Sequence, residues 1–212
     1  MSPEKLYRVR EVIAKEKAAD VNYAQRELWL MEKTVKLHRL IALPEGKEFG
    51  TLGRFIEAYV DFLPDCLEHF NEVATRSNIS AYTDIFLNLA IEYFITPPEG
   101  ITLETGFGHL IDEAYMAHRL LEELNDRCLN HLGGPAMPAD TAYANIIMHS
   151  IIGDGFANEL DMAVHYTIEA NAEKEKAVLA NLKPSPIAQV AEAAKNWPVF
   201  GEELLVGINF KF

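Results

Sequence analysis

The chain has 212 residues, of which 49% are hydrophobic and 24% are charged, and its formal net charge is -13. This length is sufficient for one domain with a buried core. Binding to nucleic acid or to anionic lipid depends mainly on basic groups. This chain has only 19 Lys and Arg residues but 32 Asp and Glu residues. The composition therefore predicts partners other than nucleic acid or membranes.

The sequence has no stretch of about 18 apolar residues that could span a membrane. Its first segment, MSPEKLYRVREVIAKEK, lacks the apolar core of a signal peptide, so we expect a cytoplasmic protein. Cys66 and Cys128 lie far apart, without the CxxC spacing of a metal site or the cysteine density of a disulfide framework. We expect both to be buried thiols.

The first predicted helix covers residues 1–43, with Ser2 as its cap and Pro3 at its first position. Its apolar residues form two stripes, which predicts two sets of neighbours. A straight helix of this length would extend about 60 Å. It therefore either bends near the segment AADVN or projects and pairs with a second copy, and we expect a homodimer. The stripes are Val21, Ala24, Leu28, Met31 and Val35, and Val12, Ala19, Leu30, Leu37 and Ile41.

Four further long helices follow, at about 51–76, 77–95, 105–132 and 140–170. Thr51 is the expected cap of the first of these, which we expect to be kinked or restarted at Pro64, and Asp140 is the expected cap of the last. The sequence predicts a short sixth helix at residues 184–197. It also predicts that residues 199–212 form a tail that packs on the helical bundle. The prediction is a single all-α domain over residues 1–212, a bundle of five long helices with a C-terminal helix and docking tail at 184–212.

The segment IIGDGF, at 151–156, interrupts the fifth predicted helix. Apolar residues before and after it lie on different sides of a helical wheel, so we expect a break at Gly153–Gly155. In the simpler interpretation Gly153 ends one segment in a left-handed turn, and Asp154 caps the next by accepting from the amide of Phe156 or Ala157. The alternative makes Asp154 a ligand or base at a flexible elbow.

The histidines match no common enzyme motif. HExxH is absent, and no glutamate is followed three residues later by histidine, so the ExxH pairs of ferritin-like di-iron bundles are absent. The pairs His109 and Glu113 (HxxxE) and His149 and Asp154 (HxxxxD) are similar in spacing to pairs in hemerythrin-like bundles. This resemblance covers four residues and lacks the HxxxH pair. It implies an iron site within a helical bundle.

Four polar side chains are expected on the apolar faces of the fourth and fifth predicted helices: His118, Asn125, Asn145 and His149. Buried polar groups need hydrogen-bond partners, so these residues form either a satisfied core network or a ligand cluster. In the ligand interpretation His118, His149, Glu113 and Asp154 bind iron or another divalent metal.

Three further residues are alternative ligands in the metal hypothesis: Asp161, His165 and His109. His165 follows Asp161 by one helical turn, a spacing that suits a carboxylate orienting an imidazole or two ligands on one face. His109 is the third. An exposed pair is the alternative interpretation of Asp161 and His165.

An acidic stripe follows the polar side of the helix predicted at 51–76, with no lysine or arginine between Arg54 and Arg76. Such a stripe is usually a solvated face, and a docking surface for a basic protein partner or for divalent cations is the functional alternative. The acidic stripe consists of Glu57, Asp61, Asp65, Glu68 and Glu72.

Three hypotheses for function result. The preferred one is a self-associating interaction or scaffold protein with an acidic surface and no assigned catalysis. The alternative is a helical-bundle metalloprotein or oxidase with its site between the fourth and fifth predicted helices. A pocket for an apolar ligand, lined by Met148, Phe156 and Tyr115, is a third hypothesis, which ordinary packing would also explain.

Overall fold

The computed structural model describes residues 2–19, 23–96, 107–137, 141–183 and 207–211. Within this part the chain forms eight α-helices and one two-stranded ribbon, which confirms the all-α prediction, with more helices than the five long and one short expected. The elements are α1 (Pro3–Ala19), α2 (Tyr23–Lys36), β1 (Ile41–Ala42), α3 (Glu48–Arg76), α4 (Ser80–Ile95), α5 (Phe107–Leu132), α6 (Ala142–Ile152), α7 (Asp154–Ala170), α8 (Ala172–Leu179) and β2 (Asn209–Phe210).

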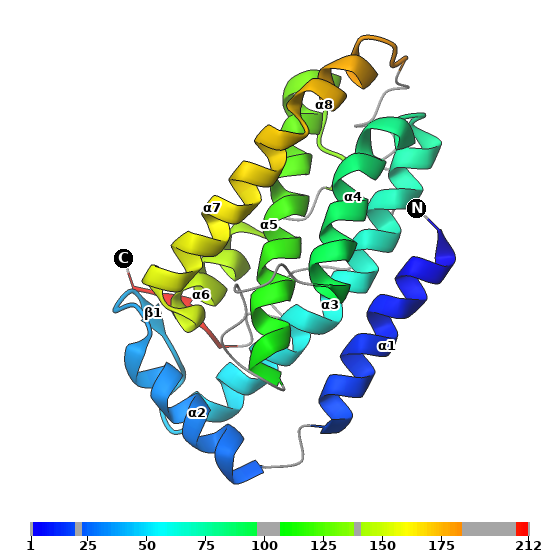
Figure 1. The fold of residues 1–212 in the computed structure, drawn as a ribbon. Helices are drawn as coiled ribbons and strands as arrows, with labels where there is room; N and C mark the ends of the chain where they lie inside the picture. The colour runs from blue at the N-terminus through cyan, green and yellow to red at the C-terminus, as the bar shows by residue number, and fades with distance from the viewer. Residues whose placement is uncertain (1, 20–22, 97–106, 138–140, 184–206, 212) are drawn as a thin grey trace.

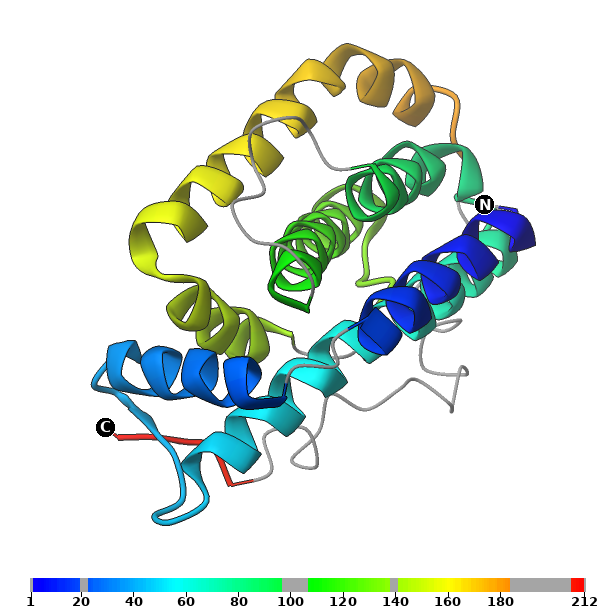
Figure 2. The ribbon, with the colours of Figure 1, turned by 60° about the horizontal axis from the view of Figure 1, so that its bottom comes forward.

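Helices α4 and α5 form the centre of the molecule and make its most extensive helix–helix contact. Figure 2 shows both nearly end-on, with α7 and α8 on one side and α1 and α3 on the other. Helix α4 is apolar around most of its circumference, as expected for a helix with neighbours on all sides. Helix α5 thus lies between the α1–α3 side and the α7–α8 side of the molecule, and it contacts α7 (Figure 1).

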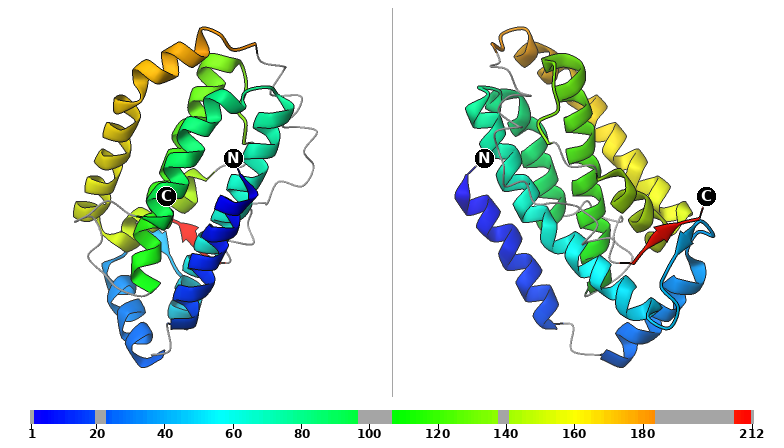
Figure 3. Two further views of the ribbon diagram at one scale, coloured as in Figure 1. Left: turned by 45° about the vertical axis from the view of Figure 1, so that its right-hand side comes forward. Right: turned by 180° about the vertical axis from the view of Figure 1, so that it is seen from behind.

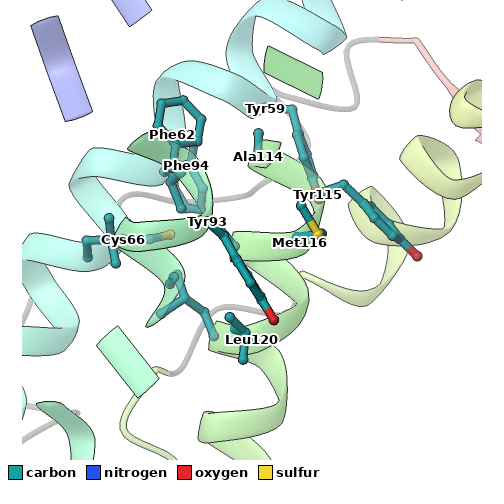
Figure 4. Close-up of a cluster of buried hydrophobic side chains, with 14 of the residues drawn as sticks. Tyr59, Phe62, Cys66, Tyr93, Phe94, Ala114, Tyr115, Met116 and Leu120 are labelled. Atoms are coloured by element: carbon teal, nitrogen blue, oxygen red, sulfur yellow. The ribbon is translucent and has the colours of Figure 1, made fainter. Parts of the chain in front are cut away.

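Helix α3 is one continuous helix that contains Pro64, so the predicted restart at that residue is wrong. It begins at Glu48 rather than at a Thr51 cap, and Thr51 is a buried residue of its first turn. The aromatic and aliphatic face of α3 is buried against α4 and α5. Figure 4 shows part of this core, where Phe62 and Cys66 of α3 meet Phe94 of α4.

The single long helix predicted for residues 1–43 is two helices, α1 and α2, followed by strand β1. Helix α1 buries Leu6, Val9 and Ile13 against the bundle, where it contacts α3, α4 and α5. Helix α2 contacts α3 and α6 instead, and its Leu30 lies 3.4 Å from where a Cβ atom on Gly53 would be. The predicted stripes do not correspond to one helix each, because the second stripe is divided between Val12 of α1 and Leu30 of α2. Most of the first stripe lies on α2 and is exposed there. Figure 3 shows α1 and α2 lying apart.

The predicted break at Gly153 is confirmed. Gly153 separates α6 from α7 and has φ +106° and ψ 134°, a backbone conformation that glycine adopts without a steric penalty. The predicted cap is wrong, because Gly153 occupies the cap position of α7 and Asp154 is its first helical residue, with no side-chain cap hydrogen bond. Asp154 instead turns back toward His149 of α6, at 3.5 Å.

The end of the described chain pairs with the segment after α2. Strands β1 and β2 are antiparallel, with Ile41 opposite Phe210, and Ile208 is buried beside them. Figure 3 shows β2 next to the α2–α3 connection. The helix predicted at 184–197 and the Asp140 cap lie outside the described residues. Among the described helices, none is both long and apolar enough to cross a membrane.

Candidate functional site

A polar pocket of about 370 Å³ lies between α5, α6 and α7. This is the region between the fourth and fifth predicted helices, where the sequence analysis located a possible site. Its described lining residues are Tyr115, Arg119 and Glu122 of α5, Ala142, Asn145, Ile146 and His149 of α6, and Asp161 of α7. The volume falls at the small end of the range for ligand pockets.

Arg119 joins two of the three helices through carboxylates. Its Nε donates to Asp161 Oδ1 at 2.9 Å, and its Nη1 donates to Glu122 Oε2. The Tyr115 hydroxyl also donates to Asp161, at 3.0 Å to Oδ1 and 3.2 Å to Oδ2. Tyr115, Arg119 and Glu122 follow one another by four and three residues, which places them on one side of α5. Helical spacing alone therefore gathers a hydroxyl, a guanidinium and a carboxylate.

Asn145 connects this cluster to the core. Its Nδ2 donates to Glu122 Oε2 at 2.6 Å, and its Oδ1 accepts from the Tyr59 hydroxyl at 2.7 Å. Asn145 and Tyr59 are both buried, and burial raises the pKa of Tyr59 well above its usual value. The tyrosine thus stays protonated as a donor. Asn145, predicted as a buried polar group, is confirmed as one with its amide satisfied on both sides.

His149 lies at the junction of α6 and α7 and faces the first two turns of α7. Its Nδ1 lies 3.5 Å from Asp154 Oδ1, and its Nε2 lies 3.3 Å from Asn158 Oδ1 and 3.9 Å from Asp161 Oδ2. The ring makes an edge contact with Tyr115 at 6.2 Å between centroids. The structure thus brings together His149, Asp154 and Asp161 of the predicted residues, because the break at Gly153 folds α7 back over the last turn of α6.

His118 of α5 is buried in the core, against α3. Its Nε2 is 3.0 Å from the Tyr59 carbonyl oxygen, and its ring lies against Tyr59 and Phe62 of α3. Burial lowers the pKa of His118 to about 4, so the imidazole is neutral at physiological pH. Asn125 is likewise satisfied, because it donates to the Met137 carbonyl and accepts from the Met137 amide. Both residues fit the core-network interpretation.

Glu113 is buried within α5. Burial, followed by the nearby charges of Asp112 and Glu16, raises the pKa of Glu113 to about 9. A carboxyl group with this pKa is protonated at neutral pH. His165 is exposed on α7 and its ring lies beside Tyr166, whereas the Asp161 carboxylate turns to Arg119. The side chain of His109 lies outside the described part of α5.

The residues proposed for a metal site are therefore divided between two sides of α5. His149 and Asp154 lie together at the α6–α7 junction, whereas His118 packs against α3. Over the described residues, no group of three or more His, Cys, Asp or Glu side chains is placed to hold a metal ion. The iron or divalent-metal hypothesis stays a prediction without a structural cluster to support it.

Each carboxylate of the acidic stripe lies in an ion pair within the chain. Helix α1 supplies Arg10, at 3.0 Å from Asp65 and 2.8 Å from Glu68, and Lys17, at 2.6 Å from Asp61. Arg26 of α2 pairs with Glu57, and Arg76 of α3 itself with Glu72 at 3.2 Å. The structure thus provides an intramolecular basic partner for the stripe, and Figure 1 shows α1 along the side of α3.

Helix α2 exposes an apolar face in addition to the one that it buries. Leu28, Met31 and Val35 are 67%, 44% and 86% exposed, although Leu30 of the same helix is buried. Their spacing of three and four residues places them on one side of the helix. Helix α2 therefore has an outer apolar face, which we define as Leu28, Met31 and Val35.

Comparison with known protein families, with characterised proteins and with solved structures finds no match to this chain. The geometry of the molecule alone therefore guides the functional proposal.

The sequence analysis did not single out Arg119 and Glu122. The available signal was a basic residue at helical spacing between Tyr115 and Glu122. Of the three residues named for an apolar pocket, Tyr115 lines the polar pocket, whereas Met148 is buried and Phe156 packs partly against the core. Figure 4 shows Tyr115 directing its hydroxyl away from the hydrophobic cluster.

Proposed function

We propose that this protein is a self-associating helical module whose copies pair through the outer apolar face of α2. The exposure of Leu28, Met31 and Val35 on one side of a 14-residue helix carries this proposal. Single exposed apolar residues are normal on protein surfaces, but an aligned row of them on one helix indicates a contact surface.

A second copy of the same chain fits this face in charge as well as in polarity. Glu27 precedes Leu28 at one end of the face, and Lys36, which pairs with Glu32 of its own helix, follows Val35 at the other end. In an antiparallel pair of α2 helices, the acidic end of one face lies beside the basic end of the other. The helix dipoles also oppose each other in that arrangement, which favours it further.

The expected affinity is modest. Burying a Leu, Met or Val side chain completely contributes about 1.5–3 kcal/mol. The side chains here are already partly covered, and association itself costs at least about 4 kcal/mol. We expect a dissociation constant of roughly 10–100 µM, which corresponds to about 5.5–7 kcal/mol.

Sedimentation equilibrium of the full chain over a range of concentrations tests the proposal. The parent protein should show a monomer–dimer equilibrium, and Leu28→Asp should weaken it by at least about tenfold, because an interface charge costs more than 1.4 kcal/mol. Leu129→Asp is the matched control, since Leu129 is also an exposed helical leucine, at 52%, but lies on α5. A monomeric parent at millimolar concentration, or equal effects of the two variants, would refute the proposal.

Disulfide trapping tests the orientation of the pair. The native Cys66 and Cys128 are buried and burial raises the pKa of both thiols, so neither competes for cross-linking. A mixture of Leu28→Cys and Val35→Cys proteins should form the mixed disulfide faster than either variant forms its own. Faster linkage of each variant to itself would show a parallel pair and contradict the antiparallel arrangement.

A further inference from the structure

The polar pocket between α5, α6 and α7 has an excess of negative charge. Among the described lining residues, Arg119 contributes one positive charge, and Glu122 and Asp161 contribute two negative charges; the His149 imidazole also lines the pocket. Arg119 stays charged, because its carboxylate partners raise its pKa further above an already basic value, despite the opposing effect of burial. The whole chain carries a charge of -13 in addition. An anionic ligand would therefore be repelled, and a cation attracted.

The two carboxylates keep acceptor capacity in spite of their contacts with Arg119. The guanidinium binds one oxygen of each, Asp161 Oδ1 and Glu122 Oε2. Glu122 Oε1 accepts no hydrogen bond from the described residues. Asp161 Oδ2 receives the longer bond from Tyr115, at 3.2 Å, and lies 3.9 Å from His149 Nε2. A carboxylate has about four acceptor positions, so both groups can accept further donors. Since one guanidinium reaches both carboxylates, the two lie close to each other.

The surrounding hydrogen bonds fix these carboxylates before any ligand arrives. Tyr115 holds Asp161, and Asn145 holds Glu122 while it is itself held by Tyr59 in the core. A preorganised site does not lose side-chain entropy when a ligand binds, which raises the affinity available from few contacts. The pocket thus differs from a solvated group of acidic side chains, whose orientations are free.

Apolar surface lines the same pocket. Ala142 and Ile146 of α6 and the ring of Tyr115 contribute it, and about half of the Ile146 surface is exposed. A ligand that combines a cationic head with a short alkyl chain matches both kinds of surface. An aromatic ring close to the cation adds a favourable electrostatic contact.

We propose that this pocket binds a small organic cation, an alkylammonium or alkylguanidinium. The cationic head donates to Glu122 Oε1 and Asp161 Oδ2, and the alkyl chain lies against Ile146 and the Tyr115 ring. A bare metal ion fits less well, because no three-ligand cluster exists over the described residues. This site is separate from the outer apolar face of α2 and does not depend on self-association.

Isothermal titration calorimetry with agmatine, an alkylguanidinium amine, at 150 mM salt tests this binding. The parent protein should bind agmatine, and Glu122→Gln should weaken binding at least about tenfold, since the variant loses a charge-assisted hydrogen bond. Glu123→Gln is the matched control. Glu123 is the next residue of α5, but it pairs with Arg127 outside the pocket. That variant should bind as the parent does.

A titration with the free amino acid arginine distinguishes a cation site from an amino-acid site, because arginine is agmatine with an added carboxylate. Agmatine should bind more tightly than arginine, and a preference for arginine would overturn the proposal. Equal weakening by Glu122→Gln and Glu123→Gln, or the absence of agmatine binding to the parent, would also overturn it. Asp161→Asn provides a second pocket variant, and circular dichroism shows whether each variant is folded.

Discussion

Two networks on α5 contain nearly the same chemical groups and differ in how open they are. In the pocket network, Arg119 binds Glu122 of its own helix and Asp161 of α7, and Tyr115 donates to Asp161. In what we term the closed network, Arg127 binds Glu123 of its own helix and Glu175 of α8, and Tyr82 donates to Glu175.

The two networks differ most in the carboxylate that comes from the later helix. The Glu175 side chain is 5% exposed, and both of its oxygens are occupied, Oε1 by Tyr82 at 2.7 Å and Oε2 by Arg127 at 2.6 Å. The Asp161 side chain is 31% exposed, and its strong bonds share Oδ1. An arginine between two carboxylates is therefore no indication of a site by itself. The open acceptor atoms and the adjoining pocket distinguish the pocket network.

The largest expected effect is the loss of stability in Glu175→Ala. This change leaves the buried Tyr82 hydroxyl without its acceptor and leaves Arg127 with Glu123 alone, and removing one partner of a buried ion pair costs about 3–5 kcal/mol. Asp161→Ala should cost about 1 kcal/mol, because Arg119 keeps Glu122 and water can reach the site. Urea unfolding monitored by circular dichroism measures both values. Equal losses would show that the two networks are equally closed.

A second prediction concerns Glu113, a buried carboxyl group of α5 whose pKa is about 9 because of burial and the nearby Asp112 and Glu16. A folded-state pKa above the unfolded value means that the folded protein binds the extra proton. The stabilising contribution of protonated Glu113 should therefore be fully present below about pH 4.5 and be lost as the pH rises to about 9. The loss of this contribution between pH 5 and 8 should be about 4 kcal/mol.

Glu113→Gln isolates this contribution, because the amide has similar size and does not titrate. Urea unfolding at pH 5 and at pH 8 should show a smaller decrease in the variant than in the parent protein. Parallel pH profiles of the two proteins would contradict the prediction and would mean that Glu113 is ionised in the folded state. Glu123→Gln serves as a control here, since Glu123 pairs with Arg127 and is not buried.

The sequence predicted the helices of the bundle because their apolar periodicity is a local property. The helix expected at 105–132 is α5 at 107–132, and the break at Gly153 was visible in a change of apolar face. The division of residues 1–43 into α1 and α2 was only partly predictable, as a bend near AADVN. The β1–β2 pairing joins residues far apart in the chain, through two residues in each strand, which is too short for a pattern.

Site residues were harder to predict, because hydrogen-bond partners come from other helices. The acidic stripe of α3 was correctly identified as a row, but its ion pairs with Arg10 and Lys17 depend on the packing of α1. The predicted role of Asp154 as a helix cap was wrong because the helix boundary lies one residue earlier than expected. Spacing within one helix does not predict the pocket network, because Asp161 of α7 pairs with Arg119 of α5 and not with His165 of its own helix.

The smallest expected effects come from removing the hydroxyl of each network, in Tyr82→Phe and Tyr115→Phe. Burial and the adjacent carboxylate raise the pKa of both tyrosines, so both hydroxyls are donors at neutral pH. Tyr82→Phe should cost about 1.5–2 kcal/mol, because it leaves Glu175 Oε1 buried and without its donor. Tyr115→Phe should cost about 0.5 kcal/mol, because Asp161 retains Arg119 and water can replace the hydroxyl.

The two substitutions remove the same atom from the same type of residue, so their difference measures how open each network is. Urea unfolding gives both stabilities, and Asp161→Asn combined with Tyr115→Phe completes a double-mutant cycle for the pocket network. A coupling energy near zero would agree with a hydroxyl that water replaces. A coupling as large as that of Tyr82 with Glu175 would mean that the Tyr115 hydroxyl and Asp161 are shielded from water, and the carboxylate would then be less accessible to a cationic ligand.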